Sequence, residues 1–87
     1  MDDKTSRRRE LRLLQQESVW LQKGLFALRK ADTMHEKVSE LRGEEEMEPY
    51  NVGHGAGSLP LSDIEDAMEE HIESLMKTVK EMRRSLR

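Results

Sequence analysis

The feature that most constrains this chain is a row of apolar residues at steps of three or four through its C-terminal third. Nearly every other position from 63 to 87 is charged or polar. This spacing places the row on one side of an α-helix. A helix with one narrow apolar stripe cannot bury that stripe alone, so it must pack against another helix. The row consists of Leu61, Ile64, Met68, Ile72, Leu75, Val79, Met82 and Leu86.

A second, longer helix is predicted from about residue 5 to residue 42, where good helix formers dominate. Its apolar residues fall on two faces about a third of a turn apart. Together with Val19 and Phe26 they form an apolar arc that is wider than one partner helix needs, so we expect packing against at least two helices. The first face comprises Leu11, Leu14, Leu21, Leu25 and Leu28, and the second comprises Leu13, Trp20, Ala27, Ala31, Met34, Val38 and Leu41.

Residues 43–61 form a linker between the segments 1–42 and 62–87. Gly43 is predicted to end the first helix, because glycine adopts the left-handed geometry of a helix C-terminus. An acidic run, two prolines and a glycine-rich stretch then predict a flexible connection. Two interpretations stay open: a natural mobile loop, or an artificial tether that joins two interacting helical fragments in an engineered single chain. The segment 49–52 favours the natural loop.

The start and end of the second helix carry their own signals. Ser62 followed by Glu65 is the spacing of a capping box. Acidic residues crowd the first half of the helix and basic residues crowd its end, which suits the helix dipole at both termini. Met76, next to the apolar row, widens the apolar face and favours a bundle over a two-stranded coiled coil.

The composition indicates an elongated assembly part rather than a compact domain. The chain has 87 residues, of which 38% are charged and 34% hydrophobic. A chain this small, whose apolar residues form stripes along helices rather than a compact core, is expected to gain stability from partner chains. The predicted fold is all-α: two long helices, as a helical hairpin or as coiled-coil segments, packed in a helical bundle with other chains. In a hairpin the longer helix would overhang by roughly 20 Å at the termini, leaving Leu11, Leu13 and Leu14 for a second chain.

The charge distribution is uneven although the net charge is only -3. Both chain ends are basic, and the region from 32 to 73 holds thirteen acids against two bases. A hairpin would therefore be a rod with one basic end and one acidic end, and two such rods could pair antiparallel. The candidate anion contacts of the basic end are Arg7, Arg8, Arg9, Arg12, Arg83, Arg84 and Arg87.

Several classes of function have no support in the sequence. There is no cysteine, so disulfides and zinc-thiolate sites are excluded. Asp32 lies one turn from His35, but two ligands are too few for a metal site, and His71 has no usual ligand one turn away. His35, His54 and His71 also form no His-x-x-x-His pair, so we expect no metal site. Clustered acids without a pocket do not make an acid–base pair, and no nucleotide or nucleophile motif occurs. We therefore expect no enzyme, no cofactor and no small-molecule substrate.

The expected location is intracellular, with cytoplasm and nucleus left open. No apolar run is long enough to span a membrane, and the first residues do not resemble a signal peptide.

The function expected from these patterns is that of a structural protein–protein interaction module, acting as an adaptor or scaffold within a larger complex. Its partners would be protein helices, through self-association or a heteromeric partner. The alternative is an accessory module that binds nucleic acid or an acidic partner through the basic end. The predicted interface comprises Leu14, Trp20, Leu21, Leu25, Phe26, Leu28, Met34, Val38, Leu41, Ile64, Met68, Ile72, Leu75, Val79, Met82 and Leu86.

Overall fold

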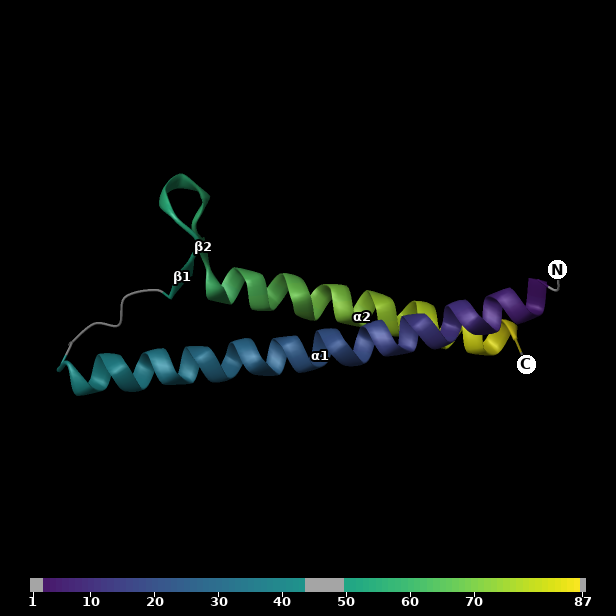
Figure 1. Ribbon diagram of the computed structural model, residues 1–87, viewed down its shortest axis with the longest axis horizontal. Coiled ribbons are helices and arrows are strands. Elements are labelled where there is room, and N and C mark those ends of the chain that lie inside the picture. Colours follow the sequence, from purple (N-terminus) through teal and green to yellow (C-terminus); the bar gives the residue numbers. More distant parts are fainter. Residues whose placement is uncertain (1–2, 44–49, 87) are drawn as a thin grey trace.

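Two long helices packed side by side make up most of the structure, a computed structural model that describes residues 3–43 and 50–86 (Figure 1). In chain order the elements are α1 (Asp3–Leu41), β1 (Asn51–Val52), a 3₁₀ turn η1 (Gly55–Gly57), β2 (Leu59–Pro60) and α2 (Leu61–Ser85). The two helices run antiparallel as a hairpin. The predicted all-α fold is confirmed.

The end of α1 lies where the sequence predicts it. The helix stops at Leu41, and Gly43 follows with a φ of 69°. Its N–H donates to the carbonyl oxygen of Glu40 at 3.1 Å. A residue with a Cβ would be strained in this left-handed conformation, which is why glycine closes the helix here. The acidic run that follows lies outside the described residues.

The start of α2 differs from the prediction. The capping box is wrong: the helix begins at Leu61, Pro60 occupies the cap position without a side-chain hydrogen bond, and Ser62 lies inside the first turn. The Leu61 N–H instead donates to the carbonyl oxygen of Tyr50 at 2.6 Å. Leu61 is also the most deeply buried side chain of the described core. Burial of this leucine and the bond to Tyr50 set the helix start two residues earlier than a cap at Ser62 would.

A short β-ribbon precedes α2 within the predicted linker. Asn51 pairs with Pro60 and Val52 pairs with Leu59, both antiparallel. Gly53 and Gly55 turn the chain between these strands with positive φ values. The residue before the ribbon, Tyr50, stacks on His35 of α1, with ring centroids 4.7 Å apart. This part of the linker is therefore folded and is attached to α1.

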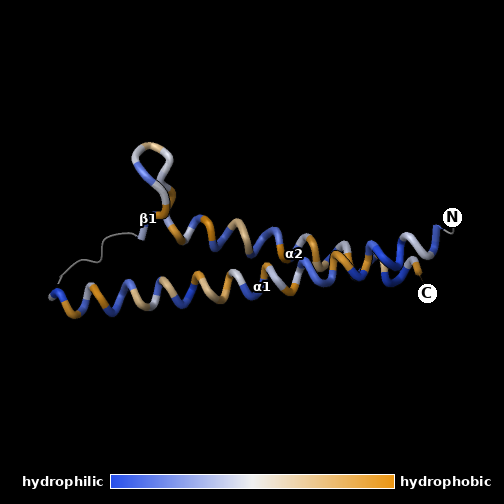
Figure 2. The backbone as a smooth tube through the Cα atoms, viewed as in Figure 1, coloured by the Kyte–Doolittle hydropathy of each residue, from blue (hydrophilic) through white to orange (hydrophobic). Residues whose placement is uncertain are grey.

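The apolar row of α2 packs against the first apolar face of α1. Figure 2 shows hydrophobic positions recurring along both helices. The buried apolar side chains come from both of them, and each stabilises the pair by about 2 kcal/mol when fully removed from water. This core consists of Leu25 from α1 and of Leu61, Ile72, Leu75 and Val79 from α2.

The overhang of α1 lies at the end opposite to the predicted one. With 39 residues against 25, α1 is longer by about 21 Å at 1.5 Å per residue. The two termini lie close together, and α1 projects past the start of α2 at the linker end (Figure 1). Leu11 and Leu14 are accordingly half-buried, whereas Leu41 is 89% exposed. The reason is the linker, which is long enough for α2 to begin part of the way back along α1.

Candidate functional site

The second apolar face of α1, together with Val19 and Phe26 beside it, has no covering partner among the described residues. α2 occupies the leucine face, and the other face points to solvent along the full length of the helix. Trp20 is 69% exposed and Phe26 is 62% exposed, which is high for aromatic side chains. We call this surface the outer face. It consists of Leu13, Val19, Trp20, Phe26, Met34, Val38 and Leu41.

Two lysines lie over the aromatic rings of the outer face. The Lys23 ammonium is 4.7 Å from the Trp20 ring centre, and the Lys30 ammonium is 4.7 Å from the Phe26 ring centre. Such cation–π contacts are worth about 0.5–1 kcal/mol at exposed sites. They therefore shield the rings only weakly, and a partner surface could displace them at small cost.

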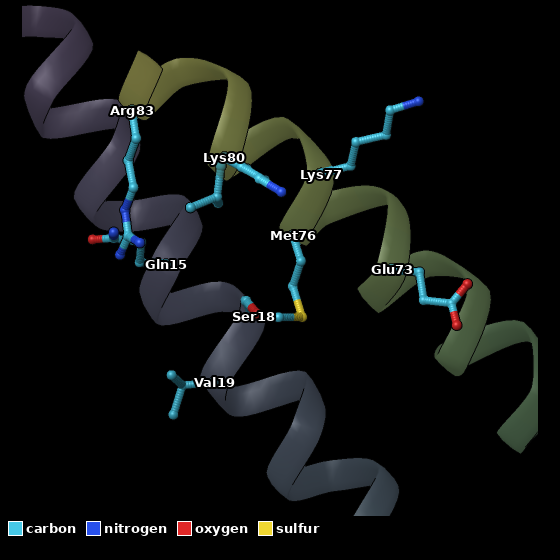
Figure 3. A pocket seen from close by; sticks show the side chains of 9 residues that line it. Gln15, Ser18, Val19, Glu73, Met76, Lys77, Lys80 and Arg83 are labelled. Atoms are coloured by element: carbon cyan, nitrogen blue, oxygen red, sulfur yellow. The ribbon is translucent and has the colours of Figure 1, made fainter. Parts of the chain in front are cut away.

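A second surface is an open groove along one side of the hairpin, between α1 and α2. Its larger part has a volume of about 780 Å³, and Val19 and Met76 stand along it (Figure 3). A smaller hollow of about 390 Å³ continues it toward Phe26. The two hollows share Glu73 and Met76, and we call them together the side groove. Buried Ser18 and Val79 also line the larger part.

Polar side chains bridge the two helices along the side groove. With its oxygen turned toward the guanidinium, the Gln15 amide accepts from Arg83 Nε at 3.0 Å. The Gln22 amide donates to Met76 Sδ at 3.7 Å. Arg29 and Glu69 form an ion pair at 3.4 Å, with both side chains more than half exposed. Exposed pairs of this kind contribute about 1 kcal/mol or less, so the apolar core holds the hairpin together.

The predicted interface residues separate into two groups in the structure. The leucines of the first face and the row of α2 meet each other within the hairpin. The remaining residues of α1 lie on the outer face. Those that meet within the hairpin and are buried or half-buried are Leu14, Leu21, Leu25, Leu28, Ile64, Met68, Ile72, Leu75, Val79, Met82 and Leu86.

The sequence analysis missed the polar residues of the helix contact. Ser18 is buried between the levels of Leu14 and Leu21, and its hydroxyl oxygen accepts from the Gln22 amide at 3.1 Å. A pattern made of apolar side chains alone does not include Ser18. The available signal is its position, since Ser18 continues the three-and-four spacing of the leucine face. A small residue there lets the helices approach and opens space beneath the side groove.

The predicted basic end is assembled by the hairpin. Arg7, Arg8, Arg9 and Arg12 are exposed in the first turns of α1, and α2 ends nearby (Figure 1). A shallow hollow of about 310 Å³ lies among Thr5, Arg8, Arg9 and Arg12. Arg83 and Arg84 are exposed in the last turn of α2. Arg87 lies outside the described residues.

The histidines are not grouped with other metal ligands. His35 stacks on Tyr50, and His54 and His71 are exposed. Within residues 3–43 and 50–86, no group of three or more histidine, aspartate or glutamate side chains could hold a metal ion. In the same part of the chain, neither helix has a stretch long and apolar enough to cross a membrane.

Comparison with known proteins adds no family to this description. The sequence matches no protein-family model, and the searches of the curated proteins and of the solved structures found no match.

Proposed function

We propose that this chain is a structural interaction module: a helical hairpin that presents the outer face of α1 to helices of other subunits in a larger complex. α2 serves to fix α1 in a straight, stable helix. α1 then acts as the adaptor, with one face used for its own fold and one face for its partners. The role requires no catalysis and no bound small molecule.

The observation that carries this proposal is the exposure of the outer face. Trp20, Phe26 and Leu13 are among its members, and each is more than half exposed. Several large apolar side chains exposed along one helix favour a protein contact, whereas single scattered ones would need no explanation. Tryptophan and other aromatics also dominate the energetics of protein interfaces. The surface extends along α1, which suits a helix lying beside it.

The test is the size of the complex that the tagged chain forms in extracts of cells that express it. The wild-type chain is expected to elute in a complex much larger than the purified chain. A Trp20→Ser/Met34→Ser variant should elute as the purified chain does, because both side chains belong to the outer face. Its matched control is Glu10→Ser/Glu36→Ser, which alters two exposed polar positions of the same helix that do not belong to the outer face, and it should leave the complex intact. A wild-type chain that elutes like the purified protein would contradict the proposal.

A second candidate function has support in the basic end. The hairpin gathers Arg8, Arg9 and Arg12 around one hollow and brings α2 to the same end. Such a cluster could contact phosphates of nucleic acid or an acidic partner. Binding to a nucleic-acid duplex that weakens steeply with salt, and that is lost in an Arg83→Glu/Arg84→Glu variant, would favour this function over the first.

A further inference from the structure

We propose that the side groove is a self-association surface, on which a second copy of this chain packs its α2 antiparallel and completes a four-helix bundle. The inference extends the proposed role as an assembly part. The side groove borders the outer face and shares Val19 and Phe26 with it, but its rim belongs to α2. The occupant of the groove is identified by the charges along its rim.

One row of α2 residues forms this rim. Its members follow at steps of four and three, so they lie on one side of the helix. Along the chain, two acids come first, a methionine stands at the centre and two bases come last. All five side chains are exposed in the single hairpin. The row is Glu69, Glu73, Met76, Lys80 and Arg83.

The order of charges along the rim is complementary to the same order read in the opposite direction, as two antiparallel copies would present it. A two-fold axis at Met76 places Glu73 of each copy opposite Lys80 of the other. The same axis places Glu69 opposite Arg83. Each dimer thus gains opposite charges at every level around the central methionines, as a self-complementary two-fold interface requires. A parallel pair would bring like charges together instead. The charge order therefore selects one orientation.

The groove also offers apolar surface at the centre of this arrangement. Met76 is 51% exposed and projects from α2 toward Ser18 of α1 (Figure 3), and exposed Val19 lines the same hollow. Methionine adapts its shape to irregular gaps, so the two Met76 side chains can fill the two grooves from opposite sides. Apolar burial at the centre with ion pairs toward both ends is the usual anatomy of a protein interface.

The outer face is unsuited to the same kind of pairing. Lys23, Lys30 and Lys37 recur at seven-residue steps along it. Two outer faces packed antiparallel would set these lysine rows against each other, which costs free energy. The outer face is therefore left for a partner of different sequence, while the side groove takes the second copy.

Charge reversal at one pair of positions tests the proposal. The purified wild-type chain is expected to sediment as a dimer of the 10.2 kDa chain. Glu73→Lys alone, or Lys80→Glu alone, turns two attractions per dimer into repulsions and should raise the dimer Kd about tenfold or more. A one-to-one mixture of the two variants, and the double variant in one chain, should both recover the wild-type Kd.

The matched control is Glu70→Lys, which makes the same charge change at an exposed position that does not line the side groove. It should leave the Kd unchanged. Circular dichroism should report equal helicity for all variants, which separates dimer loss from unfolding. The proposal is overturned by a wild-type chain that stays monomeric at high concentration, or by a mixture that associates no better than its components. Either result leaves the outer-face test standing, because that test substitutes Trp20 and Met34, neither of which lines the side groove.

A cross-link locates the axis independently. The chain contains no cysteine, so Met76→Cys introduces a single thiol at the proposed centre. Mild oxidation should convert this variant rapidly to a disulfide-linked dimer. Thr78→Cys, at an exposed position of α2 outside the groove, should react much more slowly. Equal rates for the two variants would place the axis elsewhere and reject the arrangement.

Discussion

The two apolar faces of α1 resemble each other in sequence and differ completely in their surroundings. Both consist of large side chains at helical spacing on the same 39-residue helix. Leu25 on the inner face, which is the leucine face that meets α2, is 7% exposed, whereas its neighbour Phe26 on the outer face is 62% exposed. α2 has only enough apolar surface for one of these faces, because its own row forms a single stripe. The comparison shows that one helix can carry a folding surface and a free surface side by side.

The two faces differ in the side chains that are available to pack against α2. The inner face has leucines at nearly every level from Leu11 to Leu28, and leucines interlock well with the isoleucine, leucine and valine of α2. The second apolar face instead combines large side chains such as Trp20 with the small side chains of Ala27 and Ala31. A row of similar large side chains buries more apolar area per helical turn than a row of large and small ones. Burial of apolar area is the main stabilising contribution to the fold.

The largest expected effect on stability comes from placing a charge in the contact between α1 and α2. Leu75→Asp puts a carboxylate at an 8% exposed position between the helices. We expect a loss of about 3 kcal/mol or more and a drop in helicity, because neither helix holds its fold well alone. Circular dichroism during thermal unfolding measures this. Trp20→Asp on the outer face is the comparison, and it should keep the helical signal; equal losses in both would erase the distinction between the faces.

A smaller effect distinguishes two adjacent residues. Leu25→Ala should lower the free energy of unfolding by about 2 kcal/mol, because it removes buried methyl groups and leaves a cavity. Phe26→Ala should change it by about 0.5 kcal/mol or less, because the ring is already in water. Urea unfolding of both variants gives the two values. A reversed order would mean that α2 packs on the other face of α1.

The last substitution concerns Gly24, the residue that precedes Leu25 in α1. A Cβ on Gly24 would lie 3.5 Å from Met68 Cε, which is an ordinary contact. Gly24→Ala should therefore stabilise the hairpin by about 1 kcal/mol, since alanine favours the helix and nothing has to move. The same urea experiment measures it. Destabilisation would instead reveal that α1 and α2 approach more closely at this level than the structure has them.

Much of the fold follows from local patterns in the sequence. The apolar spacing of Ile72, Leu75 and Val79 predicts the buried face of α2, and Gly43 predicts the end of α1. The candidate surfaces were predictable only in part. Trp20 and Phe26 stand out as aromatic residues in a polar chain. Ser18 is marked only by its place in the spacing of the leucine face, and Gln15 carries no signal of its own.

The sequence alone determined two amphipathic helices, their separation by a linker, and an excess of apolar faces over the helices available to cover them. These properties depend on contacts within a few residues, which the chain order encodes directly. Only the tertiary structure decided which face of α1 meets α2, at which end α1 projects, and that a groove runs beside Met76. Those choices depend on how two distant surfaces fit together and on where the linker lets α2 begin, and neither is encoded in the spacing of either helix.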